Sequence, residues 1–107
     1  MTDSERRPWT FLTNHARVLV AISQNPDIRA RDVAAMTGIT ERSTQRIVAE
    51  LEDAGYLSHE RIGRRNRYKV TTTASLRHPR EQGVEIGLLL DLFSNAGDHT
   101  SAEERRP

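Results

Sequence analysis

The sequence predicts a mainly α-helical α+β domain with a small β-hairpin and an additional helix near the C-terminus. Three observations predict this class. Apolar residues recur at helical spacing between about residues 14 and 54. Gly38 and Gly55 stand where two of these segments should end, and a short alternating segment rich in arginine follows the second glycine. A chain of 107 residues has room for one such domain, which would bury roughly 60 to 65% of the unfolded surface.

The first helix is expected after an apolar lead-in that contains Trp9 and Phe11. Thr13 or Asn14 can cap it, because either side chain can accept a hydrogen bond from a backbone N–H of the first turn. The helix should end before Pro26. Its inward face is expected to consist of Ala16, Leu19, Val20 and Ser23. Trp9 and Phe11 should anchor the N-terminal segment or take part in a subunit contact.

Two further helices are expected around a tight turn. The second covers about residues 30–37 and should turn Val33 and Met36 inward before Gly38 ends it in the left-handed conformation. The third covers about residues 41–54. Its buried face should consist of Thr44, Ile47, Val48 and Leu51. Two helices joined in this way form a helix-turn-helix.

A hairpin should follow, with strands over residues 57–61 and 67–71 and a turn supplied by Gly63 and Asn66. Residues 61–69 hold five basic groups and no acid. Tyr68 should pack inward while basic side chains occupy the other face. A hairpin in this position is the wing of a winged helix-turn-helix.

The last helix is expected from Pro79 to about residue 93, after a threonine-rich linker over residues 72–78. It carries more apolar residues than the single stripe of a surface helix. One side could cover the core while the other meets the same helix of a second subunit. The alternative is a helix enclosed within a single chain. The expected dimer contacts are Val84, Leu88, Leu89, Leu92 and Phe93.

The domain organisation follows from these elements. Residues 9–71 should form the winged helix-turn-helix domain and residues 79–93 the dimerisation helix. Residues 1–8 and 94–107 are dominated by polar, small and charged side chains, so we expect both ends to be disordered.

The composition restricts the class of protein. The formal net charge is only +1, so the placement of the basic groups is more informative than their sum. The absence of cysteine excludes disulfides and thiolate metal sites, and it suits a reducing cytoplasm. The N-terminus lacks the apolar region of a signal peptide, and no apolar run approaches membrane-spanning length. We therefore expect a cytoplasmic protein without a membrane partner.

Catalytic chemistry is not expected, and neither is a metal or a cofactor. None of the four histidines pairs with another at a spacing of three or four residues. No serine lies in a nucleophile elbow, and no phosphate-binding loop is present. The sequence therefore argues against an enzyme.

Residues 39–57, Ile-Thr-Glu-Arg-Ser-Thr-Gln-Arg-Ile-Val-Ala-Glu-Leu-Glu-Asp-Ala-Gly-Tyr-Leu, resemble the small bacterial winged helix-turn-helix regulators of the MarR and ArsR types. The resemblance spans about residues 14–71. It implies that Thr40 caps the recognition helix and that Leu51, Ala54 and Gly55 shape the exit into the wing. It also implies that four side chains face DNA, namely Arg42, Ser43, Gln45 and Arg46.

Two residues depart from the pattern of these families. Arg29 stands where they place a serine or threonine cap, so the cap is weaker or the arginine contacts a phosphate. Thr44 replaces an aliphatic anchor, which loosens packing by ~1 kcal/mol if its hydroxyl lacks a partner. The chain is also shorter than a typical MarR protein, so a small-molecule effector stays unknown.

The expected function is sequence-specific binding of double-stranded DNA by a homodimeric transcription regulator, a repressor. The recognition helix over about residues 40–54 would lie in the major groove, where arginine pairs with guanine and glutamine with adenine. The wing over about residues 57–71 would lie on the backbone or in the minor groove. Arg64 and Arg65 at the hairpin tip could reach phosphates or a narrow minor groove. The expected DNA contacts outside the recognition helix are Arg29, Arg61, Arg64, Arg65 and Arg67.

Two alternatives stay open. A solvated polar helix face and a charged hairpin edge that prevents aggregation would carry the same residues without any ligand. The rival function is a winged-helix module that binds another protein, since Glu41, Glu50, Glu52 and Asp53 reduce the positive charge of the third helix.

Overall fold

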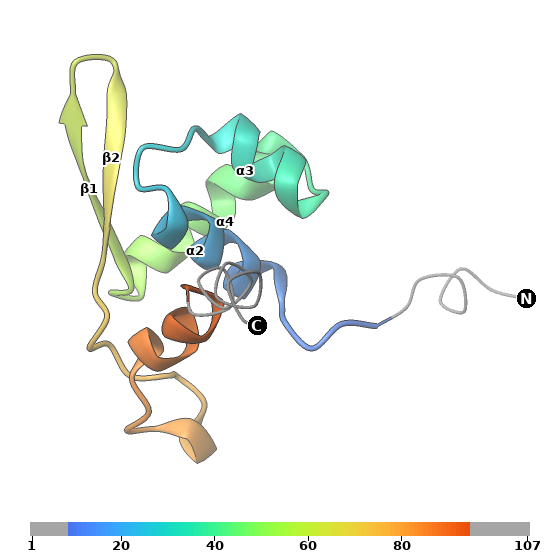
Figure 1. Cartoon of the computed structure of the whole chain (residues 1–107), viewed down its shortest axis with the longest axis vertical. Helices are drawn as coiled ribbons and strands as arrows, with labels where there is room; N and C mark the ends of the chain where they lie inside the picture. The colour runs from blue at the N-terminus through green and yellow to red at the C-terminus, as the bar shows by residue number, and fades with distance from the viewer. Residues whose placement is uncertain (1–8, 95–107) are drawn as a thin grey trace, which may run out of the picture.

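The computed structural model describes residues 9–94 and shows an α+β domain (Figure 1). The expectations for residues 1–8 and for the tail from residue 95 onward lie outside these described residues, and Ser94 is helical rather than part of a tail. The elements in chain order are α2 (Asn14–Gln24), α3 (Ala30–Thr37), α4 (Glu41–Asp53), β1 (Leu57–Ile62), β2 (Arg65–Val70), the 3-10 helix η1 (Pro79–Glu81) and a helix of residues 86–94.

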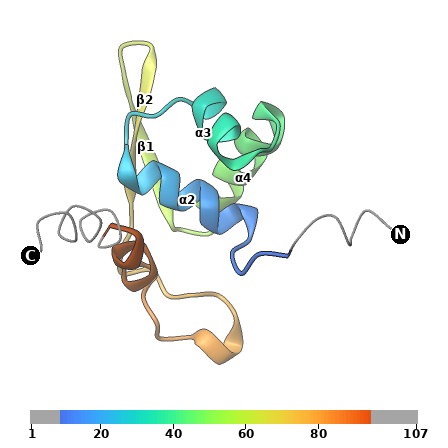
Figure 2. The same ribbon diagram turned by 45° about the vertical axis from the view of Figure 1, so that its right-hand side comes forward.

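Helix α2 lies at the centre of the domain. The hydroxyl oxygen of Thr13 caps it by accepting a hydrogen bond from the Ala16 N–H at 3.2 Å, and Asn25 ends it before Pro26. Figure 2 shows α3 and α4 on one side of α2 and the helix of residues 86–94 on the other. Because α2 packs on several elements, its buried face differs from the expected one. The residues it buries are Val18, Leu19, Ala21 and Ile22.

Helices α3 and α4 form the expected helix-turn-helix. Gly38 ends α3 with φ of 78°, a left-handed conformation that glycine adopts without steric cost, and its N–H donates to the Ala34 carbonyl at 2.9 Å. Thr40 then caps α4 by accepting from the Ser43 N–H at 3.0 Å. The prediction that Met36 turns inward is wrong, because its side chain is 63% exposed. The contacts of α3 with α2 and α4 bury Val33 and the small Ala34 instead.

The inner face of α4 matches the expected one. Ile47 and Leu51 are buried in the core, and Val48 packs against it. Thr44 is fully buried, and its hydroxyl donates to the Thr40 carbonyl at 3.0 Å. The hydroxyl therefore has a partner, and the loss of packing that an unpaired group would cause does not arise.

Strands β1 and β2 form an antiparallel hairpin that pairs Leu57 with Val70 at its base and Ile62 with Arg65 at its tip. The turn contains Gly63 and Arg64, and Gly63 has φ of 62°, as a two-residue hairpin turn with glycine first requires. The expected strands left residues 62–66 to the turn, so the expected turn was three residues too long. Asn66 lies inside β2, opposite Arg61.

The C-terminal segment differs most from expectation. Pro79 opens only η1, and the helix begins at Ile86 because Gly83, with φ of 92°, turns the chain and Ser75 forms a β-bridge with Glu85. Residues 72–78 lie against the domain, with Ala74 and Leu76 packed on the core. Ile86 and Leu90 complete the core from the helix. Within the described residues, no helix has the length and apolar character needed to cross a bilayer.

Candidate nucleic-acid interface

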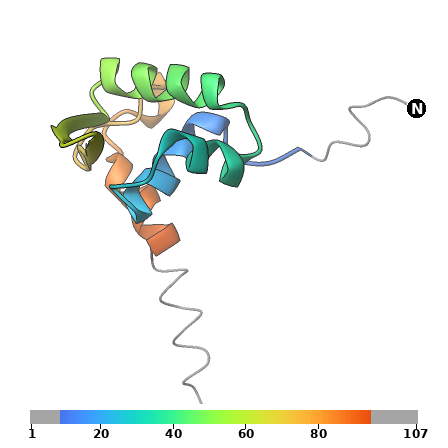
Figure 3. The same ribbon diagram turned by 90° about the horizontal axis from the view of Figure 1, so that it is seen from above.

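The outer face of α4 carries the polar residues expected to read DNA. Arg42, Gln45 and Arg46 are exposed, and Ser43, whose N–H bonds to the cap, is half-buried. Figure 3 shows α4 along one edge of the molecule, with the wing next to its C-terminal end. The helix therefore presents a polar surface beside a basic hairpin, as a major-groove helix with a wing requires.

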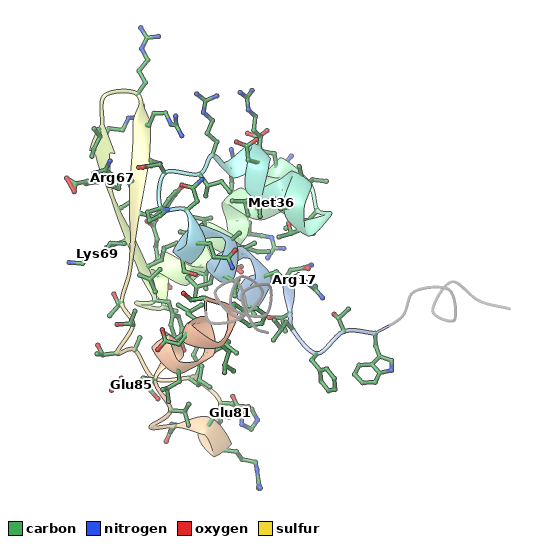
Figure 4. The ribbon with its side chains drawn as sticks, viewed as in Figure 1. Arg17, Met36, Arg67, Lys69, Glu81 and Glu85 are labelled. Carbon is green, nitrogen blue, oxygen red and sulfur yellow. The ribbon has the colours of Figure 1, made fainter. Side chains whose placement is uncertain are left out.

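Two of the predicted DNA contacts of the wing, Arg64 and Arg65, lie close to the start of α3. Arg29 precedes α3 without a side-chain cap, and it lines a shallow depression of about 290 Å³ together with Arg64 and Arg65. Figure 4 shows nitrogen-tipped side chains from the hairpin tip and from the region of α3 projecting beyond the same edge of the molecule. Cationic groups that are far apart in the sequence thus gather on one side.

A second depression of about 210 Å³ lies between α4 and the wing, and Gln45, Ala49 and His59 are among its lining residues. It shares Ala30, Asn66 and Tyr68 with the first depression. The two depressions together, called the wing–helix groove below, connect the middle of α4 to the hairpin tip. Helix α4 and the wing therefore flank one concave surface.

Two of the predicted wing contacts are engaged within the protein. The Arg67 Nε donates to the Asp27 Oδ1 at 2.9 Å, and the Arg65 Nη2 donates to the Asp27 carbonyl oxygen. The hydrogen bond and charge of Asp27 raise the pKa of Arg67 above its ordinary value. Asp27 was not predicted as a site residue, and its only sequence signal is an acid next to Pro26 in the connection between the first two helices.

Arg46 is part of a polar network that joins α4 to α2. Its Nη1 lies 3.3 Å from the Glu50 Oε2, one helical turn away, and the His15 Nε2 lies 2.6 Å from the Glu50 Oε1. The hydrogen bond from His15 holds the pKa of Glu50 below its ordinary value, and the Arg46 guanidinium acts in the same direction. A second histidine, His59 of β1, lies 2.5 Å from the Glu52 carboxylate and so joins α4 to the wing.

The pKa of Glu50 predicts how acid affects folding. A carboxyl whose pKa is lowered by folding contributes stability above its unfolded pKa, near 4.5, and this contribution is lost as the pH falls through the folded value. We expect Glu50→Gln to have a lower urea midpoint of unfolding than the parent protein at neutral pH. Below pH 4.5, the midpoints of the two proteins should become similar. Glu81→Gln, on exposed η1, is the control. Equal midpoints at neutral pH for the parent and Glu50→Gln would contradict this role of Glu50.

The residues expected to form a dimer contact divide into two groups. Leu88 and Leu92 are 62% and 64% exposed on the helix of residues 86–94, and Val84 is exposed in the loop before it. Leu89 and Phe93 are half-buried, and Leu89 packs against the core. The outward apolar side of the helix is thus narrower than predicted. No group of three potential metal ligands occurs in the part of the chain that the structure describes.

Comparison with known protein families matches residues 10–67 to the model of the MarR family. The chain belongs to the MarR family. The matched residues include α2, α3, α4 and β1, which carry the helix-turn-helix and half of the wing. The MarR family consists of transcription regulators that are not enzymes, so the MarR domain described here is a regulator domain.

Sequence and structural relatives agree with the MarR assignment. An uncharacterized protein of Methanocaldococcus jannaschii is 31% identical over 64 residues, which are 59% of this chain and 14% of that protein. The chain thus spans a small part of that relative. Crystal structures of the PcaV regulator of Streptomyces coelicolor with its natural ligand and of a Mycobacterium tuberculosis MarR family protein with salicylic acid are similar. Their TM-scores are 0.52 and 0.51 and their identities 23% and 22%. They cover 88% and 87% of this chain, which spans 72% and 62% of theirs. This likeness confirms the winged-helix fold.

Proposed function

We propose that this MarR domain binds double-stranded DNA in a sequence-specific manner and regulates transcription as a homodimeric repressor. The wing–helix groove is the observation that carries the proposal. It is flanked by the exposed polar face of α4 and by the basic hairpin, and Arg29 contributes a further cation at its edge. As part of this proposal, the protein acts in the cytoplasm.

The side chains on α4 suit base recognition in the major groove. Arg42 can donate two hydrogen bonds to guanine O6 and N7, and Arg46 can do so by leaving its exposed 3.3 Å ion pair with Glu50. Gln45 can pair with adenine N6 and N7. Ser43 can bond to a base or a phosphate. All four lie in the N-terminal half of α4, the part of a recognition helix that enters the groove.

The wing and Arg29 suit the phosphate backbone. Arg64 is exposed in the two-residue turn. Arg61 is exposed on β1, in the second residue pair from the turn. Arg29 is exposed and lines the same depression as Arg64 and Arg65, so its guanidinium can reach a phosphate beside the wing. Phosphate contacts set the register and orientation of the protein without reading sequence.

We propose that the second copy docks on Leu88 and Leu92, together with Val84, because these apolar side chains are exposed on one segment. A two-fold dimer presents two copies of α4 to half-sites about 10 base pairs apart. The operator is then an approximate palindrome. A titration of an operator duplex at concentrations above Kd should saturate at two chains per duplex.

The proposed function predicts salt-dependent binding in which the wing takes part. We expect the protein to bind random duplex DNA at low salt and to bind a selected operator more tightly. Its affinity for both duplexes should fall as the salt concentration rises. Arg64→Ala should weaken all duplexes alike and reduce the slope of log affinity against log salt by about one, because one phosphate contact is lost. Fluorescence anisotropy of labelled duplexes over a salt series measures both quantities.

The rival function, docking of another protein, gives a different outcome in that experiment. A protein-binding module should show no steep salt dependence on duplex DNA, and its Arg64→Ala variant should match the parent. Two of the acids that favoured this rival, Glu50 and Glu52, hydrogen-bond to His15 and His59, so these carboxylates are engaged within the domain.

A further inference from the structure

The turn between α2 and α3 lies against the edge of β2 that is not paired with β1. The Tyr68 N–H donates to the Pro26 carbonyl at 2.9 Å. Arg67 donates to the Asp27 carboxylate at 2.9 Å, and Arg65 donates to the Asp27 carbonyl. These three hydrogen bonds, called the turn–wing contact below, join the helix-turn-helix to the wing through residues 65, 67 and 68 of β2.

Residues 65, 67 and 69 share one face of β2, since side chains alternate along a strand. Only two of the three cations on this face contact the turn. Figure 4 shows Lys69 projecting away from the helices, whereas Arg65 and Arg67 donate to Asp27. Asp27 therefore engages two neighbouring arginines of the wing, one through its carboxylate and one through its carbonyl oxygen.

We propose that Asp27 is a positioning residue that sets the angle of the wing relative to α4, with Arg65 and Arg67 as its partners rather than as phosphate contacts. The inference rests on the proposed DNA-binding function and refines its contact set. Arg61 and Arg64 make no ion pair among the described residues, so the wing's phosphate contacts come from them.

The physical reason is geometric. A two-stranded hairpin on its own is only marginally stable, so a wing needs support from another element to hold one orientation. Binding DNA with α4 and the wing at the same time requires that both reach the duplex in one arrangement, and a mobile wing must be ordered when DNA binds. The turn–wing contact supplies this order before DNA arrives.

The alternative is that Arg67 leaves Asp27 and contacts a phosphate when DNA binds. In that case Asp27 competes with DNA for Arg67, and its removal strengthens binding. In the positioning role, removal of either partner weakens binding. The two roles thus predict opposite effects of Asp27→Ala.

The test is a double-mutant cycle on the full chain with Asp27→Ala, Arg67→Ala and the double variant, plus the charge exchange Asp27→Arg with Arg67→Asp. We expect each single variant to weaken operator binding by about two- to fivefold, the range of an exposed ion pair. The double variant should lose no more operator affinity than either single variant. The charge exchange should recover part of the lost affinity. The salt slope of Arg67→Ala should equal that of the parent, whereas Arg64→Ala, the matched control, lowers it by about one.

Two results would overturn the positioning role. The first is that the losses of operator affinity in Asp27→Ala and Arg67→Ala add in the double variant while the salt slope of Arg67→Ala falls by about one. The second is that Asp27→Ala binds the operator more tightly than the parent. A separate readout distinguishes this failure from failure of the proposed function. Amide hydrogen exchange at Tyr68, followed by NMR without DNA, should accelerate in Asp27→Ala and Arg67→Ala but not in Arg64→Ala. If the parent protein binds no duplex DNA, the proposed function is wrong. If the exchange rate at the Tyr68 amide is then also unchanged in Asp27→Ala and Arg67→Ala, the role of the turn–wing contact is wrong as well.

Discussion

Arg46→Ala is expected to weaken operator binding by roughly 1 to 3 kcal/mol and to relax the preference at one base position. Arg46 is exposed on the outer face of α4, in the half of the helix proposed to enter the major groove. In the proposed complex, the variant loses a bidentate contact to guanine together with its discrimination against other bases. Binding to a set of single-base operator variants by the parent and by Arg46→Ala measures both effects.

Arg80→Ala is the matched control for this prediction. Arg80 is an exposed arginine of η1, which Figure 1 shows at the end of the molecule opposite the hairpin tip. Its replacement removes the same charge without touching the proposed interface, so operator affinity and base preference should stay at parental values. If Arg46→Ala retains parental affinity and preference, the assignment of Arg46 to a base is wrong.

Ile47→Ala is expected to lower the free energy of unfolding by about 2 to 5 kcal/mol. Ile47 is 2% exposed and belongs to the core cluster, which it shares with Leu19 and Ile22 of α2. The shorter side chain leaves a cavity where α4 packs on α2, and the lost transfer free energy adds to the cost of the cavity. Urea denaturation followed by circular dichroism gives the difference.

Met36→Ala provides the comparison on the same helix-turn-helix. Because Met36 is 63% exposed, its replacement should change the free energy of unfolding by less than about 0.5 kcal/mol. A large loss for Met36→Ala would mean that the side chain packs inward, as the sequence predicted. A loss for Ile47→Ala no larger than that for Met36→Ala would contradict the packing of α4 described here.

The helix-turn-helix was predictable because its signals are local. Gly38 and Thr40 mark the end of α3 and the start of α4 through their own backbone and side-chain chemistry, and the structure has both boundaries where the sequence placed them. The amphipathic pattern of α4 also identified its inner face, since a helix packed on one side buries residues at regular spacing.

Elements that depend on tertiary contacts were predicted less well. The start of the last helix was placed at Pro79, although a β-bridge between Ser75 and Glu85 and a left-handed Gly83 delay it to Ile86. The buried face of α2 and the exposure of Met36 depend on which neighbours cover each helix. Helical spacing does not contain that information.

The composition of the candidate interface was predictable, but its internal pairing was not. The exposed polar residues of α4 and the basic wing follow from sequence patterns. The Asp27 partners Arg65 and Arg67 lie 38 and 40 positions away, and the His15–Glu50 pair is separated by 35 positions. Contacts at such separations arise only when the chain folds. The assignment of individual side chains to DNA stays a prediction.

The close contact at Gly87 has a mechanical consequence. The Gly87 N–H donates to the Thr72 carbonyl at 2.8 Å, and a Cβ at residue 87 would lie 2.9 Å from that oxygen. Thr72 follows the end of β2 by two residues, so this contact fixes the start of the C-terminal helix against the base of the hairpin. We therefore expect Gly87→Ala to displace either the start of this helix or the segment that follows β2, because the added Cβ does not fit between them.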